Sequence, residues 1–376
     1  MRFGLMHYWK DAFAWAWAFV DETIALHYHR QVITMGWGGT AMAQKESSLG
    51  RRLLELLLQQ GDSHVSGEEL SRLLGVTRAA VWKEMEKLRA EGYELESATR
   101  RGYRLKAIPD TMNAELVNHW LTTPRQSGLT VLEEVDSTIT HAQRMILEGE
   151  AHHGDVVIAD RQTKGAGRMG RSFESPGGVG IYLSYILQPD CDPQQLSLLT
   201  SYAGLAVCKA ITQLTSLQPA IKWPNDIILQ RKKVCGILTK LVTDAENGCI
   251  SHAVVGIGIN VGQTGFDGEL AQKAVSIRQA GAEVPRARLA AAVIENLDQI
   301  FVTEHWLHHP CSSHIKQLRD LSCTVGAEVT ILSPSSEERG RAVDIAQDGG
   351  LVVEINGKLR TITSGEVSVR GMLGYV

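Results

Sequence analysis

The hydrophobic and polar positions along this chain of 376 residues predict three regions that differ in periodicity. In the first region, leucines recur at helical spacing over residues 51–58, and two more helical patterns follow over 67–74 and 78–91. Ser66 and Thr77 stand where a side chain would cap the second and third helices, and a glycine follows each of the three helices.

Alternating polar and apolar residues follow the third helix, around a turn that contains Gly102. Such alternation on both sides of a glycine-bearing turn is typical of a β-hairpin. Helices joined by a glycine turn and followed by a hairpin form a winged helix-turn-helix. We therefore expect residues 48–108 to be an N-terminal winged helix-turn-helix domain.

The second region, residues 109–323, alternates strand-like with helical runs, which predicts a central α/β domain around a mixed sheet. Long apolar helices are expected at Leu196–Leu214 and Arg286–Trp306. Strands are expected at Thr130–Val135, Asp155–Ala159, Gly180–Leu187, Gln218–Lys222, Asp226–Leu229, Val234–Leu241 and His252–Ile259.

The third region, residues 324–376, reads as all-β, with turn sequences at 348–350 and 356–357. We expect it to form a small SH3-like β-barrel, which makes the whole chain a multidomain α+β protein. Its strands are expected at Gly326–Leu332, Arg341–Ala346, Leu351–Ile355, Lys358–Thr363 and Glu366–Val369.

Composition narrows the picture without identifying a function. The net charge of −4 excludes a chain that binds polyanions over its whole surface. No apolar run reaches the ~18 residues that span a bilayer, so we expect no membrane partner. The six cysteines form no CxxC pair and no metal-ligand spacing, which predicts free thiols in a reducing cytoplasm.

The first 47 residues differ from the rest because nine aromatic residues lie within the first 40. Two interpretations compete: an aromatic-rich helix packed on the body, or a segment translated from an upstream start codon. Met42 stands directly before the first ordinary domain sequence, so we favour the second. We expect residues 1–47 to lie outside the fold and assign them no function.

The winged helix-turn-helix is a candidate DNA-binding unit. Nine basic residues face five acidic ones between positions 71 and 106, a local excess inside an acidic chain. Many winged helices contact only proteins, but here the basic residues lie where a recognition helix and a wing meet DNA. The candidate DNA-binding residues are Thr77, Arg78, Trp82 and Lys83 in the third helix, and Arg100 and Arg101 at the wing tip.

A glycine-rich and basic segment, residues 162–171 (QTKGAGRMGR), follows a predicted strand. Glycines allow close backbone approach to an anion, and arginines supply fixed charge beside a phosphate. The spacing matches neither a P-loop nor a dinucleotide-binding turn. Taken alone, such a segment is more often a mobile surface connection than an anion site.

Three further motifs have chemistry that a generic loop does not need. Residues 222–226 (KWPND) place a lysine and an aspartate at the end of a buried strand. Residues 136–138 (DST) follow another strand and offer two hydroxyls to a small polar ligand. Residues 256–260 (GIGIN) interrupt a strand with glycines and let another group approach the sheet closely.

In this order, the winged helix, DST, the basic loop, KWPND, GIL at 236–238, GIGIN and the final SGE at 364–366 resemble the bifunctional biotin protein ligases and biotin operon repressors of bacteria. The resemblance covers about residues 49–376. It implies a biotin—[acetyl-CoA-carboxylase] ligase that joins biotin to ATP as biotinyl-5′-AMP and then transfers biotin to a carrier-protein lysine. It also implies a repressor that responds to biotinyl-AMP.

The resemblance further implies partners and roles. The partners are the biotin carboxyl carrier protein of acetyl-CoA carboxylase, the biotin operator DNA and a second copy of the chain once adenylate binds. ATP and biotin are substrates and Mg²⁺ is expected, with Asp226 as a weak candidate ligand. Lys222 and Arg168 are the expected catalytic residues. The expected biotin-binding residues are Ser137, Thr138, Gln162, Gly165, Ala166, Gly167, Arg168 and Lys222, and the adenylate-binding residues are Arg168, Arg171, Phe173 and Asn260.

The chain departs from the family pattern at three positions. Ala166 stands where the loop usually has an arginine, Ile139 where an asparagine follows DST, and Phe173 where a tryptophan follows the loop. Lys164 restores a charge, but as a point cation rather than a planar fork. We expect activity to persist, with weaker retention of the adenylate.

Two alternatives remain open at this point. The first is a ligand-sensing repressor whose ligase activity is impaired at Ala166 and Ile139. The second is a lipoate ligase or octanoyltransferase, which shares the catalytic architecture. The intact Arg168, Arg171 and Lys222 argue against the first, and the winged helix and KWPND argue against the second.

Overall fold

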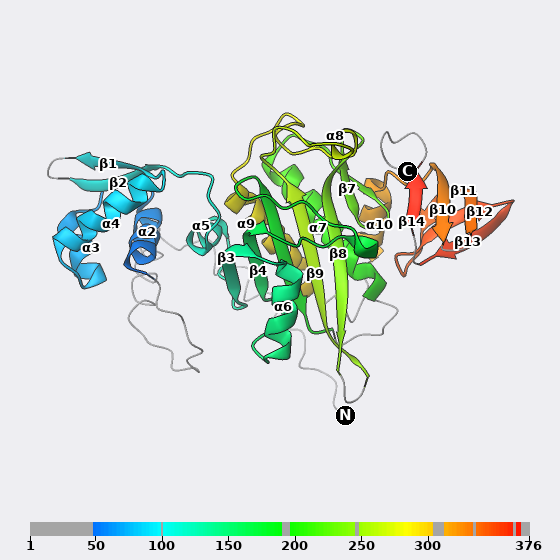
Figure 1. Ribbon diagram of the computed structural model, residues 1–376, viewed down its shortest axis with the longest axis horizontal. Helices are drawn as coiled ribbons and strands as arrows, with labels where there is room; N and C mark the ends of the chain where they lie inside the picture. The colour runs from blue at the N-terminus through cyan, green and yellow to red at the C-terminus, as the bar shows by residue number, and fades with distance from the viewer. Residues whose placement is uncertain are drawn as a thin grey trace, which may run out of the picture. The chain divides into compact units, whose positions relative to one another are not determined.

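The computed structural model describes residues 48–98, 101–189, 196–244, 248–303, 312–333, 336–363 and 366–369. The expectations for residues 1–47, for Arg100 at the wing tip and for Ser364 and Gly365 of the final motif lie outside these residues. Helices and strands are labelled as in Figure 1.

The N-terminal part is the winged helix-turn-helix that the pattern predicts. Ser66 Oγ accepts a hydrogen bond from the Glu69 backbone N–H and Thr77 Oγ1 one from that of Ala80, so both expected caps are confirmed. Gly75 ends the second helix with a positive φ of 69°, a backbone conformation that favours glycine. The elements are α2 (Leu49–Gln60), α3 (Gly67–Leu74), α4 (Arg78–Ala90), β1 (Glu94–Ala98) and β2 (Gly102–Ala107).

The central domain is built on a seven-stranded mixed sheet with strand order β3-β4-β5-β9-β8-β7-β6. Only the first pair, β3 and β4, is parallel. The strands are β3 (Leu129–Val135), β4 (Val156–Gln162), β5 (Gly180–Leu187), β6 (Ala220–Lys222), β7 (Asp226–Leu229), β8 (Lys232–Thr243) and β9 (Ile250–Asn260), each near its expected position.

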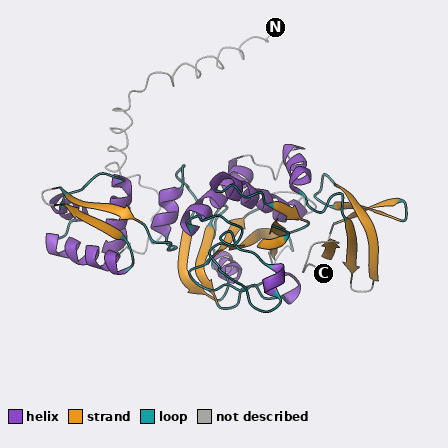
Figure 2. Cartoon of the chain, turned by 90° about the horizontal axis from the view of Figure 1, so that it is seen from above, coloured by secondary structure: helices purple, strands orange, loops and turns teal. Residues whose placement is uncertain are grey.

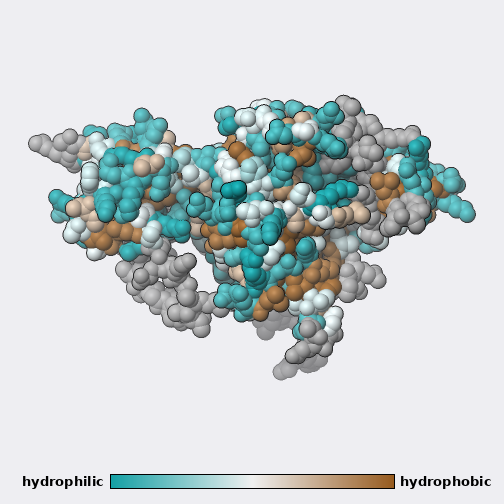
Figure 3. Space-filling model, in the orientation of Figure 1, coloured by the Kyte–Doolittle hydropathy of each residue, from teal (hydrophilic) through white to brown (hydrophobic). Residues whose placement is uncertain are grey.

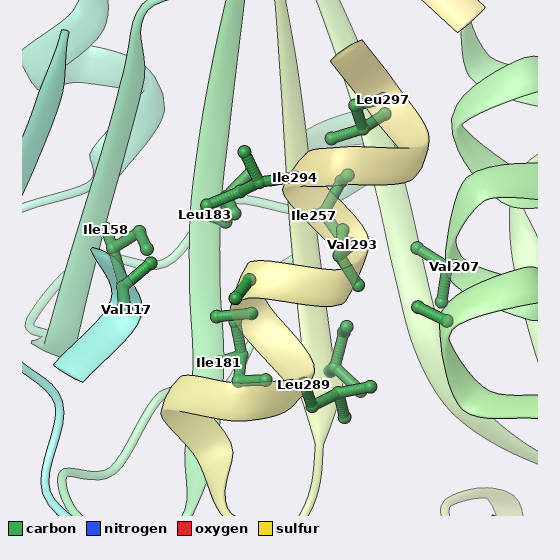
Figure 4. Close-up of a cluster of buried hydrophobic side chains, with 14 of the residues drawn as sticks. Val117, Ile158, Ile181, Leu183, Val207, Ile257, Leu289, Val293, Ile294 and Leu297 are labelled. Atoms are coloured by element: carbon green, nitrogen blue, oxygen red, sulfur yellow. The ribbon is translucent and has the colours of Figure 1, made fainter. Parts of the chain in front are cut away.

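Helices α7 (Leu198–Leu214) and α9 (Arg286–Asp298) lie together on one face of the sheet, and α6 (Thr138–Leu147) lies on the other over β4, β5 and β9 (Figures 1 and 2). Figure 4 shows the core between α9 and the sheet, where Leu289 and Ile294 face Ile181 and Leu183 of β5. All four side chains are fully buried. Burying each such side chain contributes about 1.5–3 kcal/mol, so this layer anchors the strand ends that carry the motifs.

Several short helices were not among the expectations. They are α5 (Ala114–Trp120), α6, α8 (Leu270–Lys273), α10 (Ser312–Leu321) and the single turn η1 (Arg168–Gly170). The long helix expected from Arg286 ends as an α-helix at Asp298 and continues as the π-helical segment Gln299–Thr303.

The C-terminal part is a five-stranded antiparallel sheet with strand order β13-β12-β11-β10-β14. It is the small β domain that the sequence predicts, and β13 and β14 lie at its two edges. Among the described residues no strand pairing closes these edges into a barrel. The strands are β10 (Glu328–Ser333), β11 (Ser336–Ile345), β12 (Leu351–Ile355), β13 (Lys358–Ile362) and β14 (Glu366–Val369).

The surface seen in Figure 3 is largely polar, with an apolar area beside α6. Within the described ranges, no helix is long and apolar enough to cross a membrane. The thiols of Cys208, Cys235 and Cys323 are free, as expected, while Cys191 and Cys311 lie outside the described residues.

Candidate functional site

The DST motif and Gln162 form one polar cluster at neighbouring ends of β3 and β4. Gln162 Oε1 accepts hydrogen bonds from the Thr138 backbone N–H at 2.9 Å and from Thr138 Oγ1 at 3.2 Å. Ser184 Oγ on β5 donates to Thr138 Oγ1 at 2.8 Å. The cluster lines a small cavity of about 50 Å³. Residues of β4 and β5 therefore fix the hydroxyl of Thr138 beside this cavity.

Ser137 is the member of this cluster whose hydroxyl is unsatisfied. Its side chain lines the small cavity and is only 3% exposed. In the described part of the chain, Ser137 Oγ has no hydrogen-bond partner. A buried hydroxyl without a partner costs about 1–3 kcal/mol, so its retention in a cavity wall indicates a polar ligand group at this point.

Asp136 fixes the backbone next to this hydroxyl. Its carboxylate accepts two hydrogen bonds from the Arg144 guanidinium, at 2.9 and 3.0 Å, and one from the Ser137 backbone N–H at 2.8 Å. The hydrogen bonds from Arg144 lower the pKa of Asp136 to about 2, against a smaller opposing effect of burial. Asp136 therefore acts as a charged anchor for the turn that presents Ser137.

The basic loop forms a small hairpin. The Phe173 backbone N–H donates to Gly165 O at 2.9 Å, and that of Gly167 donates to Arg171 O at 2.7 Å. A Cβ on Gly165 would lie 2.3 Å from Phe173 O, so this close backbone approach requires glycine. Ala166 is bridged to Ser172 across the hairpin, and its side chain lines the small cavity.

The KWPND turn lies against this hairpin. Arg168 Nη1 donates to Asn225 Oδ1 at 2.9 Å, which joins two motifs that are 57 residues apart in the sequence. Lys222, at the end of β6, is only 6% exposed. The peptide bond between Trp223 and Pro224 is cis. The turn thus brings a buried lysine and the loop arginine to one place.

A cavity of about 630 Å³ opens beside the turn and adjoins the small cavity, with which it shares lining residues. Both are lined by Arg168, Phe173 and Lys233. The larger cavity is lined by all of the predicted catalytic and adenylate-binding residues, namely Arg168, Arg171, Phe173, Lys222 and Asn260. Gly167, predicted for biotin, and Asp226, the candidate metal ligand, also line it. Of the predicted ligand-binding residues, Gly165 alone lines neither cavity, and its part is to shape the hairpin.

Lys233 is a site residue that the sequence reasoning missed. It lines both cavities, and its ammonium lies 2.6 Å from Asp226 Oδ1. A Cβ on Gly236 would lie 2.9 Å from Lys233 Nζ, so the glycine leaves the space that this side chain occupies. The sequence offered one signal for this residue, because Lys233 is the second of two adjacent lysines just before the GIL motif.

The glycines of GIGIN do admit close neighbours, and these are side chains of the same chain. A Cβ on Gly256 would lie 2.4 Å from Ile139 Cδ1, and one on Gly258 would lie 2.6 Å from the Phe173 ring. The departures Ile139 and Phe173 therefore both pack on the sheet face that lines the small cavity. Phe173 also meets Tyr182 edge-to-face, with ring centroids 6.3 Å apart.

Trp223 attaches the turn to the C-terminal sheet. Its ring belongs to the apolar core formed by Val329, Leu351 and Val353, and its Nε1 donates to Gly349 O at 2.9 Å. The neighbours of Lys222 are therefore held by residues more than a hundred positions away.

The predicted DNA-binding residues on α4 are exposed, as a recognition helix requires. Trp82 is 56% exposed, and Thr77, Arg78 and Lys83 are also exposed. Arg78 pairs with Glu68 of α3, and Arg101 is exposed in the turn before β2. Arg89 is different, because it bonds to Ser97 and Leu95 O and so links α4 to the wing.

No group of three or more His, Cys, Asp or Glu side chains in the described ranges could hold a metal ion. Asp226, the predicted metal ligand, has the Lys233 ammonium against one carboxylate oxygen. A nucleotide-bound Mg²⁺ commonly needs only one or two carboxylates besides phosphate oxygens, so one available carboxylate is consistent with that mode.

The fold and the two adjoining cavities are those of an enzyme, and comparison with known proteins identifies its class. Residues 131–260 match the biotin/lipoate A/B protein ligase family, residues 51–104 match a helix-turn-helix domain, and residues 324–370 match the biotin protein ligase C-terminal domain. The biotin protein ligase from Aquifex aeolicus in complex with biotin and ATP aligns with a TM-score of 0.55 and 30% identity, over 65% of this chain and 98% of that chain.

Curated relatives match this chain over nearly their whole length. The chain is 33% identical over 328 residues to the bifunctional ligase/repressor BirA of Bacillus subtilis, an alignment that covers 86% of this chain and 99% of the relative. It is 28% identical to BirA of Escherichia coli K12, over 87% of this chain and 98% of the relative. This chain belongs to the bifunctional ligase/repressor family of biotin protein ligases, which confirms the resemblance found in the motifs.

Proposed function

We propose that this chain joins biotin to a carrier protein and represses transcription in response to the intermediate of that reaction. In the first step a carboxylate oxygen of biotin attacks the α-phosphate of ATP, and pyrophosphate leaves. In the second step the amine of a carrier lysine attacks the acyl carbon, loses a proton and forms an amide, and AMP leaves.

The observation that carries this proposal is the pair of adjoining cavities. The small one offers the Ser137 hydroxyl and the Thr138–Gln162 cluster, which suit a small polar head group. The large one has cations at Arg168, Arg171, Lys222 and Lys233, which suit phosphates. A carboxylate bound at the junction would therefore meet the nucleotide beside Arg168.

The cations have a physical task in the first step. They reduce the repulsion between a carboxylate and a triphosphate and stabilise the charge that builds on the reacting phosphate. Lys222 is best placed for this task, since burial strengthens its electrostatic effect. The loop hairpin, held to the turn by Arg168 and Asn225, would exclude water that otherwise hydrolyses the adenylate.

We expect Mg²⁺ to enter with ATP, where it would neutralise phosphate charge, and Asp226 is the candidate protein ligand. Asp226 and Lys233 together would then contact opposite charges of the same metal–nucleotide complex. Biotin binding is proposed to depend on Ser137, Thr138, Gln162, Gly165, Ala166, Gly167, Arg168 and Lys222. Adenylate binding is proposed to depend on Arg168, Arg171, Phe173 and Asn260.

The proposed partners are the biotin carboxyl carrier protein of acetyl-CoA carboxylase and the biotin operator. We propose that the adenylate promotes a homodimer whose two recognition helices meet two half-sites, and that the protein works in the cytoplasm. The proposed domains are 48–108 for DNA, 109–323 for catalysis and 324–376 for the β domain, with residues 1–47 outside the fold.

A combined assay tests both activities of the full chain. We expect pyrophosphate release that requires biotin, biotin transfer to the carrier protein, and tighter operator binding with biotin and ATP. Absence of pyrophosphate at saturating substrates would favour a ligand-sensing repressor with impaired ligase activity. Equal operator affinity with and without the two ligands would contradict the regulatory part, and sedimentation under the same conditions tests the dimer.

A further inference from the structure

Arg286 is a buried cation that the proposed catalytic chemistry does not use. It is the first residue of α9, lines neither cavity, and its side chain is only 2% exposed. Burying a guanidinium costs several kcal/mol unless acceptors surround it. Each of its side-chain nitrogens has such an acceptor, and the acceptors belong to two different segments of the chain.

On one side Arg286 holds the segment that leaves the winged helix. Its Nε donates to Asp110 Oδ2 at 3.3 Å, its Nη2 to Asp110 O at 2.7 Å, and its backbone N–H to Asp110 Oδ1 at 2.8 Å. Asp110 lies three residues after β2. The guanidinium and the first backbone N–H of α9 therefore hold this linker through both the side chain and the backbone of Asp110.

The same linker touches the residues that follow the recognition helix. Asn113 Nδ2 donates to Tyr93 Oη at 3.0 Å. A Cβ on Gly92 would lie 3.4 Å from Pro109 Cβ, which is ordinary contact distance. Because Gly92 and Tyr93 directly follow α4, a shift of the linker reaches the C-terminal end of that helix.

On the other side Arg286 holds the neck of the basic loop. Its Nη1 donates to Asp160 Oδ1 at 2.5 Å, and Asp160 Oδ2 accepts from the Gly178 backbone N–H at 2.9 Å. Asp160 lies in β4 two residues before Gln162, which bonds to Ser175 through its backbone and its side chain. These contacts close both ends of the loop that runs from 163 to 175.

We propose that Arg286 is a positioning residue that couples occupation of the ligand site to the DNA-binding unit, by joining the neck of the basic loop to the linker through Asp160 and Asp110. A planar guanidinium shared by two carboxylates cannot follow one of them without changing its bonds to the other. Ligand binding that rearranges the loop neck thus alters the linker. This inference rests on the ligand-dependent repression proposed above.

The test compares ligand coupling in the full-length wild type and in D110N, which is nearly isosteric and whose side chain is 45% exposed. The measured quantity is the ratio of operator Kd values without and with biotin plus ATP. Since energetic coupling between sites is typically about 5- to 150-fold, we expect D110N to lower this ratio at least fivefold. Operator Kd without ligands and the rate of pyrophosphate release are expected to stay within about twofold of the wild type, as for a residue outside both sites.

The control is D298N, which weakens another buried arginine–aspartate pair of the same domain, with Arg125. This pair touches neither the linker nor the loop neck, so the coupling ratio is expected to stay at the wild-type value. R286K is the second variant, because it keeps the charge but replaces the planar fork, whose separate nitrogens reach Asp110 and Asp160, with a single ammonium. It should lower the ratio as D110N does.

The outcomes separate this inference from the proposed function. A wild-type ratio well above one that both D110N and R286K leave unchanged overturns the role of Arg286 alone. An equal fall in D298N also overturns it, because the effect would then be general destabilisation. A wild-type ratio of one overturns the ligand-dependent repression and this inference together, while pyrophosphate release still reports on the ligase.

Discussion

Two polar clusters of the central domain differ in how well their buried groups are satisfied. Around Arg286, each guanidinium nitrogen has a protein acceptor. In the small cavity, Ser137 Oγ is buried without a partner among the described residues. A satisfied cluster stabilises the fold, whereas an unsatisfied one keeps bonding capacity for a ligand. The difference predicts opposite effects of substitution on stability and on ligand binding.

The largest expected effect is on catalysis at the ligand cavity. Replacing Lys222 with methionine keeps the stem of the side chain and removes its charge. We expect biotin-dependent pyrophosphate release to fall about 100-fold or more, as when one charge-stabilising donor is lost from an active site. The matched control is K240M, an exposed lysine on β8 outside both cavities. Equal activity of the two variants would contradict the role of Lys222.

The next effect is on stability at the satisfied cluster. R286M leaves the carboxylates of Asp110 and Asp160 without their shared partner, and we expect a loss of about 3 kcal/mol in the free energy of unfolding. Urea denaturation measures it. The control R144M removes an arginine–aspartate ion pair that is exposed, with 46% and 34% of the two side chains accessible. Its loss should be clearly smaller, because exposed ion pairs contribute little to stability, and equal losses would show that burial does not matter here.

Ser137 gives the sharpest contrast between the two clusters. We expect S137A to weaken biotin binding about tenfold while leaving stability unchanged or raising it by up to about 1 kcal/mol, because an unsatisfied buried hydroxyl is removed. The control S276A removes a fully buried hydroxyl that donates to Gln263 O at 2.6 Å. That variant should lose about 1 kcal/mol of stability and keep biotin affinity. A stability loss in S137A would mean that its hydroxyl has a partner within the protein.

Ala166 tests whether charge is missing from the basic loop. Its side chain lines the small cavity, where the family pattern has an arginine. We expect A166R to slow the release of the adenylate roughly threefold to tenfold, the effect of about one charge-assisted hydrogen bond. A trapped radiolabelled adenylate measures the release rate. An unchanged rate would mean that Lys164 or Arg168 already supplies the charge.

The sequence predicted those parts of the fold whose signals are local. Ser66, Thr77 and the glycines that follow the helices mark α3 and α4, and the strand boundaries lie close to the expected ones. The motifs also identified most of the cavity lining. Helices α5 and α6 were missed because they are only 7 and 10 residues long, and α6 begins inside the DST motif without a side-chain cap.

The groups that were missed at the site depend on contacts between distant residues. Lys233 contacts Asp226 across the β7–β8 hairpin, which contains a register shift between Ile227 and Ile228. No pattern of residues in the sequence predicts this shift. Arg286 meets partners that are 126 and 176 residues away in the sequence. Periodicity reports which face of an element is buried, but it does not report which buried charges will meet.

The smallest expected effect concerns Asp136, whose ion pair with Arg144 is more exposed than the contacts of Arg286. Its pKa of about 2, lowered mainly by Arg144, lies below the ordinary value of 3.8. Because the folded-state pKa is depressed, the stabilisation is fully present above about pH 4 and is lost as the pH falls toward 2. Solvent screening of this exposed pair limits it to less than about 1 kcal/mol. The stability gap between wild type and D136N, measured in urea, should therefore narrow from pH 6 to pH 3. A gap that stays constant would mean that the charge of the Asp136 carboxylate contributes nothing to stability. Hydrogen bonding to the side chain at position 136 would then be enough to hold the turn before Ser137.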